Sequence, residues 1–374
     1  MKGVTPKIKK LGVNEIKRYG NLYEKIYSFE NLYNAYLKAR KNKRYREEVL
    51  RFTANLEENL ITIQNELVWE TYKVGRYKEF YVYEPKKRLI MALPFKDRVV
   101  QWAIYQVIQP IFDKGFLVHS YACRKGKGTH NAADTVQNWL KEIKRKNEDF
   151  YYLKLDISKY FYRVNHEVLL GILGRKIKDE RLMKLFEKLV NSDDKNFGLP
   201  LWTEPGEAEL VEGVGMPIGN LTSQLFANIY LNELDSFVKH TLREKRYIRY
   251  MDDVIILNKS KERLKQILPE IEIFLEDHLQ LHLNNKTVLR PVRTGISFVG
   301  FRIWWSHKRL KKKTFVKMKS RIRYISNSYS KNKINFHSAN QTMQSYFGIM
   351  KHFDSHNLRK HIVRDFIFRK KEDK

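Results

Sequence analysis

Two adjacent aspartates, Asp252 and Asp253, lie between short runs of β-branched, aromatic and other apolar residues that extend over positions 246–257. This pattern predicts two strands joined by a tight turn, with both acids at the tip of the hairpin. Adjacent carboxylates repel each other unless a cation neutralises them, and Mg²⁺ prefers oxygen ligands of this kind. The pair is therefore either a metal site or a solvated turn, since aspartate is common in turns. A second pair, Asp193 and Asp194, lies in a wholly polar stretch and is interpreted as a surface loop.

A further strand is predicted over 151–157, where apolar and polar residues alternate. Leu153, Leu155 and Ile157 share one face, so Asp156 points to the other. A carboxylate at the end of a buried strand can join the hairpin acids around the same metals, with Ile157 contributing only its backbone carbonyl. The alternative is that Asp156 caps the turn that follows the strand.

The chain of 374 residues is strongly basic, with 72 Lys and Arg against 42 Asp and Glu and a formal net charge of +30. Such an excess favours a polyanionic partner, because each neutralised phosphate releases counterions. The 22 Tyr and 21 Phe offer surfaces on which bases can stack. The alternative is a surface that is merely basic.

One cysteine, Cys123, excludes an internal disulfide and a cysteine-based zinc site, which favours a reducing compartment. The first residues lack the apolar run of a signal peptide, and no uncharged apolar segment is long enough to span a bilayer. We therefore expect a cytoplasmic protein with no membrane association.

A β-ribbon is predicted from two strand-like runs, 77–83 and 89–93, separated by a basic turn. Cations at the tip of such a ribbon suit a loop that closes over a triphosphate, and Lys87, Arg88 and Arg98 are the candidates. Hairpin charges that pair with each other are the alternative.

Further basic residues are candidates for contacts with nucleic-acid phosphates. One group lies in the Gly-interrupted loop 120–130, which precedes a helix-like stretch, and the other lies in the basic C-terminal region. They are Arg124, Lys125, Lys127, Lys311, Lys312 and Lys313.

Hydrophobic periodicity predicts most of the remaining elements. Helices are expected over 14–70, with one apolar stripe, and also over 99–111, 180–190 and 260–279, the last breaking or bending near Pro269. A Gly-rich turn, 215–224, opens another apolar helix, a strand pair lies around 295–305, and the chain is expected to be helical from His307 onward. The stripe consists of Phe52, Leu56, Leu60, Ile63 and Leu67.

In this order along the chain, Asp156, the turn 215–224, Tyr250–Asp253, Lys286 and Phe298–Phe301 resemble the motifs of a reverse transcriptase, over roughly residues 50–350. The resemblance implies an α+β right-hand polymerase with an antiparallel palm sheet and helical fingers and thumb. The implied domains are an N-terminal helical extension (1–75), fingers (76–149), a palm (150–305) with a fingers insertion at about 163–214, and a basic helical thumb (306–374).

The same resemblance implies roles for the motif residues. Asp156, Asp252 and Asp253, with the carbonyl of Ile157, would bind two Mg²⁺ ions, with Mn²⁺ as a substitute, and Lys286 would protonate pyrophosphate. Phe161 would be the steric gate that excludes a 2′-hydroxyl, beside Ile218, Gly219 and Gln224 in the nucleotide site. Primer and template would contact Tyr250, Met251, Phe298, Gly300 and Phe301. The implied substrates are an RNA template, an RNA or DNA primer and dNTPs.

One difference from the usual reverse transcriptase motifs indicates a particular group of these enzymes. The chain has Ile-Gly-x-x-x-Ser-Gln at 218–224, where most reverse transcriptases have Gln-Gly-x-x-x-Ser-Pro, and this variant resembles the enzymes of bacterial and phage diversity-generating retroelements. These are error-prone at template adenines and are assisted by a small basic accessory protein. An anti-phage defence reverse transcriptase is one alternative, and a non-catalytic RNA-binding protein on a polymerase fold is another. The expected location is the bacterial cytoplasm, and the oligomeric state stays open.

Overall fold

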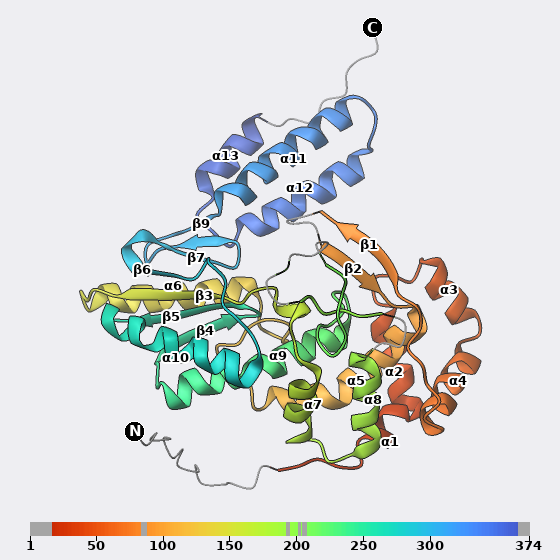
Figure 1. Ribbon diagram of the computed structural model, residues 1–374. Coiled ribbons are helices and arrows are strands. Elements are labelled where there is room, and N and C mark those ends of the chain that lie inside the picture. Colours follow the sequence, from red (N-terminus) through yellow and green to blue (C-terminus); the bar gives the residue numbers. More distant parts are fainter. Residues whose placement is uncertain (1–16, 84–87, 192–194, 201–202, 204–207, 366–374) are drawn as a thin grey trace, which may run out of the picture. The chain divides into compact units, whose positions relative to one another are not determined.

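A computed structural model describes residues 17–83, 88–191, 195–200, 203 and 208–365. The chain divides into two compact units, each assembled from separate stretches of sequence (Figure 1). The helical unit comprises residues 1–116, 159–233 and 274–281, and the sheet unit comprises 117–158, 234–273 and 282–374.

The helical unit is built mainly from amphipathic helices whose apolar faces form a common core. Its helices are α1 (Tyr23–Tyr27), α2 (Phe29–Ala39), α3 (Glu47–Ala54), α4 (Leu56–Val68), α5 (Phe95–Asp113), α7 (His166–Gly174), α8 (Glu180–Val190) and most of α9 (Leu221–Ser236). The apolar stripe predicted for one helix crosses two, because the chain leaves the helical conformation at Asn55. Phe52 therefore packs from α3, whereas Leu60, Ile63 and Leu67 are fully buried on α4.

The predicted β-ribbon is confirmed in the same unit. Strands β1 (Lys78–Val82) and β2 (Arg88–Ala92) pair antiparallel, with Lys78 opposite Ala92 and Val82 opposite Arg88. Every residue of β1 is exposed. The predicted surface loop at Asp193–Asp194 and the nucleotide-binding candidate Lys87 lie outside the described residues.

The sheet unit contains a four-stranded antiparallel sheet in the order β4-β5-β3-β6. Its strands are β3 (Tyr151–Asp156), β4 (Arg246–Tyr250), β5 (Asp253–Asn258) and β6 (Val288–Pro291). Helix α6 (Thr129–Arg145) packs on one face, where its Val136 and Leu140 join Tyr152, Ile248 and Ile255 in one core. The predicted hairpin around the acidic pair is thereby confirmed as β4, a turn and β5.

A second sheet in this unit has three strands, and one of them corrects a prediction. Strands β7 (Ile296–Phe298) and β8 (Phe301–Ile303) form the expected pair, but β8 also pairs with β9 (Lys308–Leu310), where a helix was expected. The side chain of Lys308 is largely buried and forms an ion pair with Asp134 of α6. The partners of this segment, β8 and Asp134, lie far away in the sequence, so local composition does not predict the extended backbone at Lys308.

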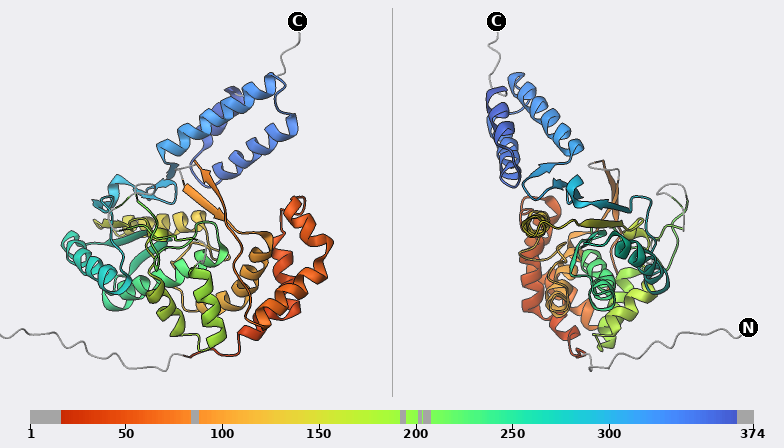
Figure 2. Two further views of the ribbon diagram at one scale, coloured as in Figure 1. Left: turned by 45° about the vertical axis from the view of Figure 1, so that its right-hand side comes forward. Right: turned by 90° about the vertical axis from the view of Figure 1, so that its left-hand side faces the viewer.

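The C-terminal region is helical from Lys312, five residues after the predicted start at His307. Helices α11 (Lys312–Ser330), α12 (Phe336–Met350) and α13 (His356–Asp365) lie side by side in the views of Figures 1 and 2. Their small core contains Met318, Ile322, Met343 and Met350. The remaining elements are α10 (Lys261–Leu279), which the two units share, and short turns at Tyr160–Tyr162, Phe237–Thr241 and Val292–Thr294. Of the predicted break or bend near Pro269, the break does not occur, because helix α10 continues through that residue.

The observed fold is therefore α+β with antiparallel sheets, as the sequence predicted. Among the described residues, no helix has both the length and the apolarity needed to cross a bilayer.

Candidate functional site

The acidic residues singled out in the sequence meet at one end of the sheet. Asp156 is the last residue of β3 and Asp253 is the first residue of β5, and the antiparallel register places them directly opposite each other. Asp252 lies in the turn between β4 and β5, beside Met251, whose φ of 55° is left-handed. Directly opposite residues project their side chains from the same face of a sheet. Two carboxylates therefore share one face, with the third beside them in sequence.

Each of the two paired carboxylates has a polar partner. The Lys154 ammonium lies 2.5 Å from Asp253 Oδ1 and also donates a hydrogen bond of 3.0 Å to the carbonyl of Ser297. The Asn284 amide donates a hydrogen bond of 2.6 Å to Asp156 Oδ2. The Lys154 and Asp253 side chains are only 15% and 26% exposed, so water screens their attraction weakly.

Burial governs the electrostatics of this cluster. Burial raises the pKa of Asp253, and the nearby Lys154 and Lys311 ammonium groups oppose that shift. Burial also lowers the pKa of Lys311, and repulsion from Lys154 adds to the effect. Two facing carboxylates in a largely buried site repel each other unless positive charge lies nearby. Lys154 and Lys311 provide that charge here.

The chemistry of these side chains fits a hard divalent cation. Asp156, Asp252 and Asp253 offer only oxygen donors, and Ile157 follows the first of them with a backbone carbonyl. Within the described ranges, no group of three or more His, Cys, Asp or Glu side chains is arranged closely enough to hold a metal. Two of the three carboxylates are engaged by Lys154 and Asn284 instead.

Replacing Lys154 with methionine should destabilise the fold when no divalent cation is present. The substitution keeps the apolar stem but leaves two facing carboxylates without their internal cation, at an expected cost of about 1–3 kcal/mol in the free energy of unfolding. Urea denaturation in chelator measures this loss, and added Mg²⁺ should reverse part of it.

A matched control is Lys259→Met, because Lys259 forms an ion pair with Glu148 and its side chain is 62% exposed. We expect that variant to stay within about 0.5 kcal/mol of the unchanged protein, as exposed ion pairs contribute little. Equal losses in both variants would contradict a special role for Lys154.

The gate candidate Phe161 belongs to the helical unit. It lies in the single helical turn Tyr160–Tyr162, which Lys159 enters with a left-handed φ of 46°. The Phe161 carbonyl accepts a hydrogen bond of 2.7 Å from the amide of Met216, and the Gly215 amide donates to Val164 at 2.8 Å. The turn that carries Phe161 is thus fixed to the Gly-rich turn 215–224, as neighbours in one unit.

The Gly-rich turn 215–224 contacts β2 and α5. The Ile218 carbonyl accepts a hydrogen bond of 3.0 Å from the Met91 amide, and the Leu221 amide donates to Gln101 Oε1 at 2.9 Å. Gly219 has a φ of 127° and is exposed, and a Cβ there would lie 3.1 Å from the Met91 carbonyl. Ile218 and Gln224 are half-buried.

Several predicted phosphate ligands are engaged by the protein itself. Arg98 binds both carboxylate oxygens of Glu48, at 2.8 and 2.7 Å, and the carbonyl of Leu93. Arg124 donates to the carbonyls of Leu117 and Ser120. These two arginines hold loops together, which favours a structural role.

The other basic candidates differ in exposure. Lys127 donates to the Val118 carbonyl at 2.7 Å, whereas Arg88 and Lys125 are exposed. Lys286 is exposed too, and its amide donates to Asn284 Oδ1 at 2.7 Å. Asn284 therefore joins the Lys286 loop to Asp156.

The aromatic candidates near β7 and β8 are core residues. Phe298 and Phe301 are buried opposite each other, and the turn between them, Val299–Gly300, has φ values of 41° and 90°. The two rings are therefore unavailable to a ligand, whereas a Cβ at Gly300 would meet no atom within 4 Å. Tyr250 is half-buried and packs against the same core.

A run of cations stands at the start of α11. The Lys311 amide donates to the Gly300 carbonyl at 3.0 Å, and Lys312 and Lys313 are exposed. The first turn of α11 contains no acidic residue. Positive side chains oppose the helix dipole at an N-terminus, where an anion is favoured. The arrangement is therefore suited to a phosphate.

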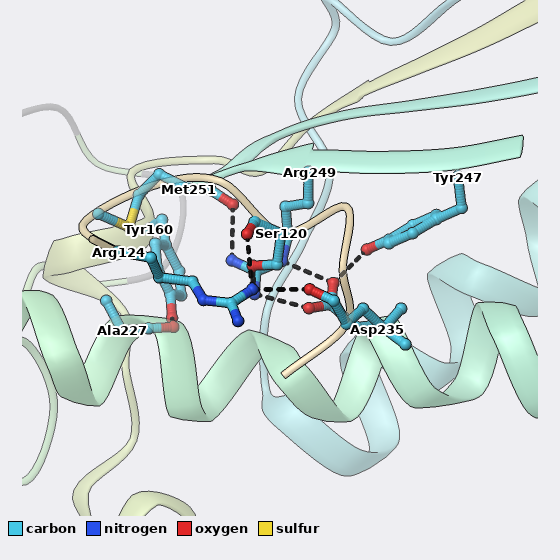
Figure 3. A network of polar contacts seen from close by, with 9 residues as sticks. Ser120, Arg124, Tyr160, Ala227, Asp235, Tyr247, Arg249 and Met251 are labelled. Carbon is cyan, nitrogen blue, oxygen red and sulfur yellow. Dashed lines mark hydrogen bonds and ion pairs between the residues drawn. The ribbon is translucent and has the colours of Figure 1, made fainter. Parts of the chain in front are cut away.

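Sequence reasoning missed three polar residues that contact the acids or the turn that carries them. Lys154 could have been found from the strand alternation, since it lies two residues before Asp156 and so on the same face. Asn284 carries no local signal. Arg249 could have been noticed as an arginine inside an apolar strand, but its partner Asp235 could not (Figure 3).

Comparisons with known proteins identify a family for the chain. The family model described as reverse transcriptase (RNA-dependent DNA polymerase) matches residues 78–303. Protein YkfC of Escherichia coli is 27% identical over 285 residues, which cover 67% of this chain and 72% of YkfC. The group II intron-encoded protein LtrA of Lactococcus lactis is 25% identical over 314 residues, which cover 66% of this chain and 50% of LtrA. The match therefore spans only half of LtrA.

Solved structures show weaker likeness. An apo telomerase from Candida tropicalis, truncated from its C-terminal domain, has a TM-score of 0.46 and 16% identity, with 64% of this chain and 55% of that chain covered. A partial Cas6-RT-Cas1–Cas2 complex has a TM-score of 0.39 and 20% identity, with 68% of this chain and 42% of that chain covered.

Proposed function

Because the chain belongs to the reverse transcriptase (RNA-dependent DNA polymerase) family, we propose that it extends a primer 3′-hydroxyl with deoxynucleoside triphosphates on an RNA template. Family membership supports RNA-directed DNA polymerase activity, and the α+β fold with antiparallel sheets is consistent with a right-hand polymerase. The observation that carries the proposal is the register of β3 against β5, which places Asp156 opposite Asp253 beside the turn at Asp252.

Asp156, Asp252 and Asp253 would hold two Mg²⁺ ions, with the Ile157 carbonyl as a further donor. When bound, such ions activate an attacking hydroxyl and stabilise a leaving oxyanion in an in-line displacement. Asn284 orients the Asp156 carboxylate through its 2.6 Å hydrogen bond. Lys286, exposed on the loop that Asn284 joins to Asp156, is our candidate for donating a proton to the leaving pyrophosphate.

We propose contacts to the substrates for several residues. Arg88 on the β-ribbon and the exposed Gly219 suit the triphosphate and base of an incoming nucleotide, and Phe161 is proposed to exclude a 2′-hydroxyl. Lys312 and Lys313, at the start of α11, suit phosphates of the primer and template.

Primer extension tests the proposed reaction. The full chain is incubated with a defined RNA template, an annealed primer, dNTPs and Mg²⁺, and the products are resolved by length and sequenced. DNA complementary to the RNA, lost in chelator, supports the proposal. Tight RNA binding without synthesis across varied primers and metals, Mn²⁺ included, would instead favour the non-catalytic RNA-binding alternative.

We further propose that the polymerase is error-prone, as in diversity-generating retroelements. The support is Ile218, which offers an apolar side chain at the position where most reverse transcriptases have an amide. An apolar group provides no hydrogen bond to discriminate between incoming nucleotides. This role would require a template-repeat RNA and a small basic accessory protein in a bacterial cytoplasm. A defence role would show accurate or template-independent DNA.

Restoring glutamine at position 218 should lower the error rate. One added hydrogen bond corresponds to about 1 kcal/mol, so misincorporation should fall by about 3–10-fold, chiefly opposite template adenine. Sequencing of primer-extension products from Ile218→Gln measures the change. Ile273→Gln is a suitable control, because Ile273 is 59% exposed on α10. An error spectrum identical to that of the control would refute the assignment.

A further inference from the structure

Arg249 is a fully buried arginine that directly precedes the Tyr250–Asp253 motif. Its side chain is 0% exposed, as is that of Asp235 in the last turn of α9. No substrate can touch a guanidinium in this position. Its role must therefore act through the residues that it contacts.

The guanidinium donates hydrogen bonds to three different segments of the sheet unit (Figure 3). It binds Asp235 through both carboxylate oxygens, with N–O distances of 2.6 and 2.7 Å. It donates to Ser120 Oγ at 3.0 Å, in the loop before α6. It also donates to the carbonyl of Met251 at 3.2 Å, inside the acidic turn. Tyr247 Oη donates to Asp235 at 2.5 Å and supports the same carboxylate.

The sheet separates this network from the acids. Side chains alternate along β4, so Arg249 and Tyr247 share one face, whereas Ile248 and Tyr250 occupy the other. Tyr250 lies opposite Asp253 in the register, so Asp253 shares the face of Tyr250. Arg249 therefore holds the turn from the face opposite to the acids.

The turn needs such support because its backbone is unusual. Met251 has a left-handed φ of 55°, which L-residues other than asparagine, aspartate and histidine rarely adopt. The backbone of Arg249 is also fixed, since its amide donates to His119 and its carbonyl accepts from Tyr121, both at 3.0 Å. Hydrogen bonds of both the backbone and the side chain of Arg249 thus fix the segment that leads into the turn.

Stability alone does not explain a buried ion pair of this kind. Desolvation of two charges offsets most of their attraction, and apolar side chains of similar volume often serve the fold equally well. A guanidinium, unlike an apolar group or an ammonium, can bind a carboxylate with two parallel hydrogen bonds and still donate elsewhere. The buried arginine is therefore explained by the hydrogen-bond geometry that a guanidinium provides.

We propose that Arg249 is a positioning residue that fixes the turn carrying Asp252 and Asp253, with Asp235 as its anchor. This inference rests on the proposed polymerase function, because the positioned carboxylates are the proposed metal ligands. A carboxylate displaced by a fraction of an ångström loses metal geometry, so the effect falls on the chemical step.

Arg249→Lys tests this inference, since lysine keeps the charge beside Asp235 but cannot also reach the Met251 carbonyl. The rate constant of single-nucleotide incorporation per active site, measured in a burst experiment, should fall by about 10–100-fold. The KM for dNTP should change less than about threefold, because the displaced groups act on the reaction rather than on ground-state binding. Per-site rates remove any contribution from unfolded protein.

Arg263→Lys is the matched control. Arg263 donates to Glu244 at 3.2 Å and to the Leu242 carbonyl at 3.1 Å in the same unit, without touching the acidic turn. Its per-site rate should equal that of the unchanged protein. If Arg249→Lys does not fold, Asp235→Asn replaces it, because the amide keeps the shape of the anchor and weakens its hold on Arg249.

Amide hydrogen exchange separates this inference from the polymerase proposal. Exchange at residues 250–253 should accelerate at least about tenfold in Arg249→Lys, as a lost turn contact allows local opening, and should not change in Arg263→Lys. Unchanged exchange in the turn, or an unchanged per-site rate, overturns the positioning role. If the unchanged protein makes no DNA under any condition, the proposed polymerase function fails, and the exchange result alone decides whether Arg249 holds the turn.

Discussion

Asparagine at both Asp252 and Asp253 is expected to abolish DNA synthesis while leaving the protein folded. Each substitution keeps the size of the side chain and removes the negative charge that a divalent cation needs. Loss of a metal that stabilises both attacking and leaving oxygens should lower the rate by on the order of 10³-fold, or about 4 kcal/mol of activation free energy. Primer extension on an RNA template measures the rate, and circular dichroism verifies the fold.

The chain offers its own charge-matched control for this experiment. Asp193→Asn/Asp194→Asn removes the same charges from a second adjacent pair, in the polar stretch 191–196. We expect that variant to synthesise DNA normally. If the substitutions at Asp252 and Asp253 retain more than a tenth of the activity, or if both double variants lose it equally, the hairpin acids are not the catalytic ligands.

Alanine at Phe161 is expected to admit ribonucleotides. The ring is proposed to occupy the space that a 2′-hydroxyl would need, and a clash of this size costs about 1–3 kcal/mol. Its removal should therefore lower the preference for dNTP over rNTP by about 10–100-fold. The measurement is kcat/KM for matched dATP and ATP on the same template.

Tyr162→Ala controls for the loss of an aromatic ring from the same helical turn. Its side chain is half-buried next to Phe161, but it is not assigned to the sugar. We expect its sugar selectivity to stay within about threefold of the unchanged protein. Selectivity that changes equally in both variants, or in neither, would contradict the gate assignment.

Local pattern was sufficient to predict the elements that carry the acids. The β-branched and aromatic residues on both sides of Asp252–Asp253 specify the hairpin β4–β5, and the alternation over 151–157 specifies β3. In each case the information lies within about ten residues, because the side-chain period of a strand repeats every two positions. The opposite pairing of Asp156 and Asp253 also requires the register that the structure shows, because adjacent strands can pair in more than one register.

Local pattern failed where a distant partner overrides composition. The basic segment Lys308–Leu310 reads as part of a helix, yet it forms β9, because β8 provides its hydrogen bonds and Asp134 neutralises Lys308. The resemblance implied nucleic-acid contacts for Phe298 and Phe301, and the structure buries both rings in the core. Whether a side chain is exposed depends on which parts of the folded chain pack against it. The neighbouring residues in the sequence do not specify those parts.

Periodicity and short motifs were sufficient to predict the order of the main elements and the acidic hairpin, because both signals act over short distances in the chain. The α+β fold class came from the resemblance to reverse transcriptases. Only the tertiary structure decided which cations serve the acids and which hold the protein together. Lys154 lies 99 residues from Asp253, and Arg98 lies 50 residues from Glu48. The contact between Arg249 and Asp235 spans 14 residues and forms only where β4 meets the end of α9, because a buried charge takes its partner from the folded chain.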